Sequence, residues 1–180
     1  MKLIRNLRRF ARETKGLAAL EFAIIAPLLM VPLLLGSVDL IDVMGANKRA
    51  QNAASSLADV VARDTEISNS EITNLWRALD VLMYPNEAGS MEIRVSSISI
   101  VNASTARVVW SEGHGGMTAR TANSTVTLDS RMMNPGTSII MVESVYKYDA
   151  PLGFLFQNQV RMTHDAYRRS RLVDPIPRVA

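Results

Sequence analysis

The sequence predicts an α+β protein in which a long N-terminal transmembrane helix extends into a head with a second helix and a small antiparallel sheet. Three observations support this fold class. An apolar run occupies residues 17–38, helical spacing of apolar residues continues after it, and β-branched segments fill the second half of the chain. Helices followed by successive strands are typical of an α+β domain whose sheet packs on a helix.

Length and composition allow one modest domain with an additional element. The chain has 180 residues, 48% of them hydrophobic, and no cysteine, which excludes disulfides and thiolate chemistry. The formal net charge is +3, but the basic residues gather in residues 1–16, where six of them oppose the single Glu13. The rest of the chain is slightly acidic, so we expect no nucleic acid partner.

The apolar run at residues 17–38 is long enough to cross a bilayer. As a helix it reaches about 33 Å, against about 30 Å of hydrocarbon. Glu21 is its only charged residue, and Pro27 and Pro32 are tolerated because membrane-spanning helices accept proline. The basic segment at residues 1–16 should stay in the cytoplasm, which places the remainder of the chain outside.

Three interpretations of this N-terminal region compete. A secretory signal peptide has an apolar core of about 7–15 residues, shorter than this run. A plain membrane anchor explains the length and the basic flank but gives no reason for Gly16 or Glu21. The third interpretation places a cleavage between Gly16 and Leu17, which creates a free α-amine on Leu17. Glu21 lies one helical turn further on, where its carboxylate can meet the new amine of a neighbouring subunit.

The segment GLAALEFAIIAPLLMVPLLLG, preceded by a basic leader, resembles the type IV prepilin-like proteins, and in particular the TadE/TadG-like pseudopilins of the tight-adherence (Flp) pilus system. The resemblance implies that a prepilin peptidase cleaves the leader between Gly16 and Leu17. It further implies that Glu21 and Phe22 serve subunit registration, or that Glu21 serves recognition of the cleavage site.

The same resemblance implies a pilin-like head and a non-catalytic role in pilus assembly. No cofactor and no metal are expected, because the sequence has no motif for binding either. The implied partners are other pseudopilins and pilins, the inner-membrane pilus assembly platform and membrane lipid. The implied location is the bacterial inner membrane, crossed once, with the C-terminal head in the periplasm. The segment NAASSLADVVAR stands where the family often has Ala-Arg-x-Gly-Ala-Arg, so the TadE-like, TadF-like and TadG-like subtypes stay open.

Five segments follow from these observations. They are a cytoplasmic prepilin leader at 1–16, a transmembrane helix at 17–38, a periplasmic helix extension at 39–66, an α+β periplasmic head at 67–174 and a tail at 175–180.

The helix extension is predicted by an apolar stripe after the run. Its members are Leu40, Met44, Ala50, Ala54, Leu57 and Val61. A face of small residues between Ala50 and Ala58 suits either a core contact or a subunit contact. Asp39 and Asp42 are expected to form a solvated collar just beyond the membrane edge.

A second helix is predicted with Ser68 or Ser70 as its cap and Pro85 as its stop. Its apolar stripe consists of Ile72, Leu75, Trp76, Leu79, Leu82 and Met83. Strands are predicted over 92–101, 106–112, 137–150 and 159–169, with Ile140, Val142, Tyr146 and Tyr148 on one face of the third. In the first strand the apolar parity changes at Ser96-Ser97, which suggests a bulge.

Catalytic motifs are sparse. His114 and His164 lie far apart without a metal-binding spacing, and the glycine-rich SEGHGGMT lacks the lysine of a phosphate loop. We therefore expect a connection between strands there. Arg168, Arg169 and Arg171 are expected to be solvated or to contact an acidic partner.

The alternative function is a signal-anchored envelope enzyme or ligand-binding protein. A convergent polar pocket that holds His114 together with carboxylates would favour it.

Overall fold

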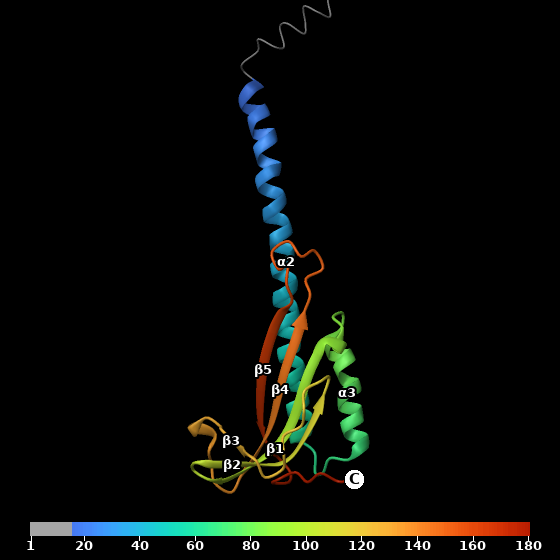
Figure 1. Ribbon diagram of the computed structural model, residues 1–180, viewed down its shortest axis with the longest axis vertical. Coiled ribbons are helices and arrows are strands. Elements are labelled where there is room, and N and C mark those ends of the chain that lie inside the picture. The colour runs from blue at the N-terminus through green and yellow to red at the C-terminus, as the bar shows by residue number, and fades with distance from the viewer. Residues whose placement is uncertain (1–15) are drawn as a thin grey trace, which may run out of the picture.

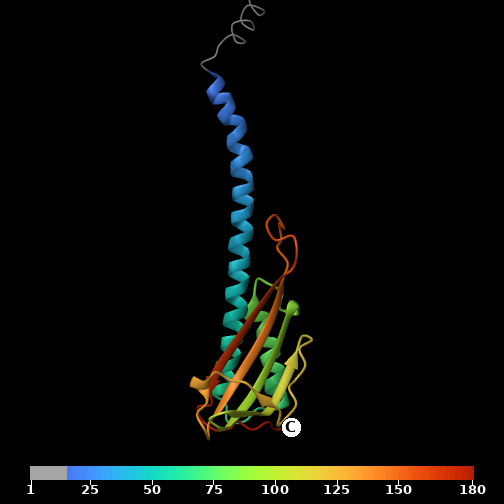
Figure 2. The ribbon, with the colours of Figure 1, turned by 60° about the vertical axis from the view of Figure 1, so that its left-hand side comes forward.

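The computed structural model describes residues 16–180 (Figure 1). Helix α2 spans Leu17–Ala62; its first half stands clear of the head, and its second half lies along a sheet, as Figures 1 and 2 show. The α+β fold class predicted from the sequence is confirmed, including the long N-terminal helix, the second helix and the antiparallel sheet.

The head is a five-stranded sheet with helices on one face. Its elements are α3 (Asn69–Met83), β1 (Met91–Asn102), β2 (Thr105–His114), β3 (Thr125–Val126), β4 (Ser138–Tyr148) and β5 (Val160–Arg169), with short 3-10 turns η2 (Ala88–Ser90) and η3 (Ser130–Met132). The strand order is β3-β2-β1-β4-β5, and neighbouring strands are antiparallel. The four strands predicted from the sequence correspond to β1, β2, β4 and β5.

The face of α2 that meets the sheet is made of alanine. The fully buried alanines are Ala46, Ala50, Ala53, Ala54, Ala58 and Ala62. Because alanine carries one methyl group, the helix backbone approaches strands β4 and β5 closely, and Figure 2 shows the lower half of α2 running beside the sheet. The small-residue face is therefore core surface within this chain.

The N-terminal end of the apolar stripe predicted for α2, Leu40 and Met44, is wrong. Leu40 is 47% exposed and Met44 is 63% exposed, whereas Asp39 and Val43 are buried against the head. The buried line follows residues 39, 43, 46 and 50, in steps of three and four. Leu40 and Met44 lie one residue further along, which turns their side chains by about 100° around the helix axis.

Helix α3 begins at a capping box that selects Ser68 from the two predicted caps. The Ser68 hydroxyl accepts a hydrogen bond from the Glu71 backbone N–H (3.3 Å), and the Glu71 carboxylate accepts one from the Ser68 backbone N–H (2.6 Å). These bonds lower the pKa of Glu71 because they favour its charged form. The predicted stripe faces inward: Ile72, Leu75, Leu79 and Met83 are buried.

Strand β1 contributes to two apolar cores. Ile93 and Val95 pack in the main core under the helices. Ile98 and Ile100 pack in a second core on the other side of the sheet, beneath apolar side chains of the segment 126–133. The apolar residues of β1 therefore change parity because the first half of the strand faces the helices and the second half faces the segment 126–133.

The bulge predicted at Ser96-Ser97 lies on the neighbouring strand. Pairing of β1 with β2 shifts between Ser97 and Ile98, and Val109 of β2 is left without a partner in the register. Pairing of β1 with β4 continues through the same residues without a shift.

The C-terminal residues close the base of the head. Ile176 is fully buried, and its carbonyl accepts a hydrogen bond from the Trp110 indole N–H (2.8 Å). Ile67, at the end of the connection from α2 to α3, pairs with Arg178. The predicted tail at 175–180 thus packs against the head.

Candidate membrane and assembly interface

Residues 17–35 of α2 present an apolar surface in which no residue is buried by the head. Among residues 16–180, α2 is the one helix long and apolar enough to cross a membrane, and none of its most apolar window is buried within the chain. Phe22 is 72% exposed and Leu28 is 74% exposed. A helix with so continuous an apolar surface requires lipid or neighbouring helices to cover it.

The residues predicted at the processing site lie at the start of this helix. Gly16 is the N-cap of α2, Leu17 is its first residue, and Glu21 and Phe22 follow within the second turn. Leu17 and Glu21 are four residues apart and therefore share one face of the helix. All four are exposed, so they are free to contact other molecules. The predicted leader residues 1–15 lie outside the described residues.

The fold places no demand for glycine at position 16. A Cβ atom built on Gly16 meets no heavy atom within 4 Å, and its φ of −94° suits any residue. By contrast, the glycines after β2 have positive φ, +69° at Gly115 and +105° at Gly116, as a tight turn requires. The glycine at position 16 is therefore not explained by the packing of the folded chain.

The loop between β4 and β5 reaches up to the end of the apolar segment of α2 (Figure 1). Asp39 is fully buried there, and its carboxylate accepts a hydrogen bond from the Leu155 backbone N–H (2.8 Å). The expected solvated collar is thus wrong for Asp39, whereas Asp42 is exposed. Burial raises the pKa of the nearby Tyr148, and the charges of Asp42 and Asp39 raise it further.

The basic cluster at the end of β5 contacts an acidic residue of the same chain. Arg171 donates a hydrogen bond to Asp59 of α2, and Arg168 forms a looser ion pair with the same carboxylate (3.8 Å). Arg168 also donates to the Ser55 hydroxyl (3.1 Å). These contacts hold the end of β5 against α2.

The His114 side chain contacts an aromatic ring. Its ring stacks on Trp76 of α3, with ring centroids 5.0 Å apart and planes inclined by 11°. The shallow hollow beside it has one carboxylate, Asp80, among its lining residues. His164 lies on β5, and within residues 16–180 no group of three potential metal ligands is found. In this described part of the chain, His114 does not lie in a pocket where several carboxylates converge.

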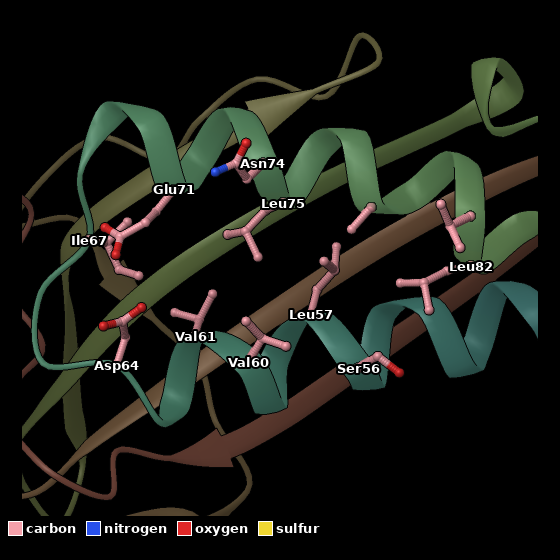
Figure 3. Close-up of a pocket in the computed structure, with 12 residues that line it drawn as sticks. Ser56, Leu57, Val60, Val61, Asp64, Ile67, Glu71, Asn74, Leu75 and Leu82 are labelled. Carbon is pink, nitrogen blue, oxygen red and sulfur yellow. The ribbon is translucent and has the colours of Figure 1, made fainter.

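An apolar groove of about 460 Å³ separates the lower end of α2 from α3 (Figure 3). In Figure 3 side chains from the two helices, among them Val60, Leu75 and Leu82, line its walls. Its acidic residues, Asp64 and Glu71, lie at the end where the chain turns between the helices, and Glu71 is engaged with the cap of α3. The groove offers apolar surface without a convergent set of reactive groups.

Among residues 16–180, the structure thus combines one exposed apolar helix that could span a membrane with an α+β head. A family model described as TadE-like protein matches residues 16–59, from the N-cap of α2 to its alanine face. The chain therefore carries a TadE-like segment, consistent with a TadE-like protein of the tight-adherence pilus system. This is a pilus-associated structural family, which is not known for enzymatic activity. No curated protein and no solved structure matches the chain.

Proposed function

We propose that this protein is a membrane-anchored minor pilin or pseudopilin that supports assembly of a tight-adherence (Flp) pilus. It acts by subunit packing after leader cleavage and carries out no catalysis itself. The observation that carries the proposal is that the TadE-like match begins at Gly16, the N-cap of α2, and includes the whole exposed half of the helix with Glu21. Its partners are a prepilin peptidase, other pseudopilins and pilins, and the inner-membrane assembly platform.

Packing through α2 follows from the surface of the helix. Cleavage after Gly16 leaves an α-amine on Leu17 with a pKa of about 7.7–8.0, which is mostly charged near neutral pH. Glu21 is exposed one turn along the helix, so a neighbouring subunit shifted along its axis can bring its amine to this carboxylate. Phe22 and the apolar residues after it then fill the contact between helices.

Topology follows from the position of the basic residues. With residues 1–16 held in the cytoplasm, the head lies in the periplasm. We expect a periplasm-active reporter fused after Arg171 to be active, and a cytoplasm-active reporter at the same site to be silent. The opposite pair of results would overturn the proposed orientation. Because a fusion at Arg171 omits the buried Ile176, a second fusion after Ala180 keeps the whole head and is expected to give the same result.

The N-terminal residue of the protein purified from membranes tests the proposed processing directly. We expect it to be Leu17 in the presence of the peptidase. Substitution of Gly16 by alanine, and more strongly by valine, should leave the leader attached, because the peptidase must reach the backbone at a small, flexible residue. Position 16 lies at the start of α2, outside the head, and an added Cβ meets no heavy atom within 4 Å, so the head should stay folded in both variants.

A mature terminus between Ser37 and Asp39 would contradict this proposal. It would indicate signal-peptide processing and favour the alternative of an envelope enzyme or binding protein. Such a cut would also separate Gly36 from the helix that supports the β4–β5 loop.

A further inference from the structure

The β4–β5 loop carries an apolar tip that the head does not cover. Residues 150–158 contain no charged side chain. Leu152 is 53% exposed, Phe154 is 43% exposed and Leu155 is 53% exposed. Three large apolar side chains exposed within four residues are unusual for a loop in water, where polar residues normally dominate.

The tip is held in place at both ends. Ala150 and Phe156, on either side of it, pack against the main core of the head. The Leu155 backbone N–H donates to Asp39, and the Leu155 side chain lies against Gly36, where an added Cβ would approach it to 3.2 Å. The apolar side chains are thus presented by an anchored loop beside α2.

These anchors place the loop at the end of the candidate span. Gly36 lies in the last turn of the apolar run at residues 17–38, so the loop meets α2 where the run leaves the bilayer. Figures 1 and 2 show the loop rising from the sheet toward the free half of the helix. In the next turn of α2, Leu40 and Ile41 are exposed and apolar. Asp42 follows them and is exposed, and a charged carboxylate belongs among the lipid headgroups or in water, so the bilayer surface lies close to this residue.

We propose that the tip of the β4–β5 loop, formed by Leu152, Phe154 and Leu155, inserts into the bilayer surface beside α2. Lipid is favoured as the occupant because the tip is continuous with the apolar surface of the candidate span and lies at the same level. The inference rests on the proposed membrane anchoring of α2. It gives the head a second point of attachment, which restricts its tilt and fixes the face that it shows to neighbouring subunits.

Single-cysteine labelling tests the contact without background, since the chain has no cysteine. The full chain carrying Leu152→Cys is labelled with an environment-sensitive fluorophore and reconstituted in phosphatidylethanolamine/phosphatidylglycerol vesicles. Quenching is compared between lipid-attached spin labels and aqueous iodide. Two matched variants serve as references: Leu34→Cys on the exposed half of α2 (60% exposed) and Val101→Cys at the opposite end of the head (55% exposed).

We expect the probe at position 152 to be quenched several-fold more strongly by lipid-attached labels than the probe at 101, and several-fold less by iodide. A probe at 152 that behaves like the one at 101, while position 34 reports lipid, overturns the loop insertion and leaves the span intact. If the probe at position 34 is also not quenched by lipid-attached labels, the membrane anchoring of α2 itself is overturned. Shielding at 152 that disappears when protein is diluted in lipid indicates a neighbouring subunit as the occupant and also overturns the proposal.

Discussion

Replacement of Glu21 by glutamine or leucine is expected to leave the protein in the membrane at normal or higher levels while pilus output falls to near background. A neutral residue enters lipid more easily than a carboxylate, whose cost at the centre of a span is about 2.5–3.5 kcal/mol and smaller near the edge. Insertion should therefore improve. Assembly should fail because the Leu17 amine of a neighbouring subunit loses its partner.

The structure makes this test specific to assembly. Glu21 is exposed and has no hydrogen-bond or ion-pair partner among the contacts of residues 16–180, so its replacement removes nothing from the fold. Membrane-fraction abundance, leader cleavage and surface piliation are measured in the same strains. Glu21→Asp keeps the charge and serves as the matched control, with partial piliation expected because its carboxylate is one methylene shorter.

Normal piliation in the glutamine or leucine variant would show that Glu21 is an incidental charge at the membrane edge. If leader cleavage fails together with piliation, Glu21 serves recognition of the cleavage site instead of registration. The two roles are thereby separated by one experiment.

Local signals explain why the sequence was sufficient for predicting the helices and the main strands. A run of apolar residues, the Ser68 cap and the alternation in β4 each depend on neighbours within a few residues. The candidate processing site at Gly16, Leu17 and Glu21 also depends on a local pattern, because the three residues lie within the first two turns at the start of one helix.

Long-range contacts explain what the sequence did not reveal. Asp39 directly follows the apolar run at residues 17–38, a position that suggests solvent, but its carboxylate is bonded by the Leu155 backbone, 116 residues later in the chain. The second core escaped prediction because the two-residue strand β3 and the segment after it have no periodicity of their own. The apolar loop tip was missed for a similar reason, since its level beside α2 is set by the tertiary fold.

The alanine face of α2 is the case in which the sequence allowed two interpretations and packing chose one. Small residues on a helix suit a tight contact with any surface, whether in the same chain or in another subunit. Ala50 and Ala54 are fully buried in a single chain, so the first interpretation holds for them.

Substitution of Ala50 by leucine is therefore expected to destabilise the head of the isolated subunit. Ala50 is 0% exposed, and the larger side chain forces the helix and the sheet apart at an otherwise full contact. Overpacking of this kind costs about 1–3 kcal/mol. For a domain of this size, each kcal/mol lowers the melting temperature by about 2–4 °C, so we expect a fall of about 2–12 °C in detergent solution.

Asn52→Leu is the matched control, because it introduces the same leucine side chain two residues further along, on the exposed side of the same helix. Its effect on the free energy of unfolding should stay within about 0.5 kcal/mol. Equal melting temperatures for the two variants would contradict the packing of α2 against β4 and β5. If Ala50→Leu instead kept the subunit stable and only weakened association between subunits, the alanine face would belong to the assembly contact, and the exposed half of α2 would no longer suffice to explain packing.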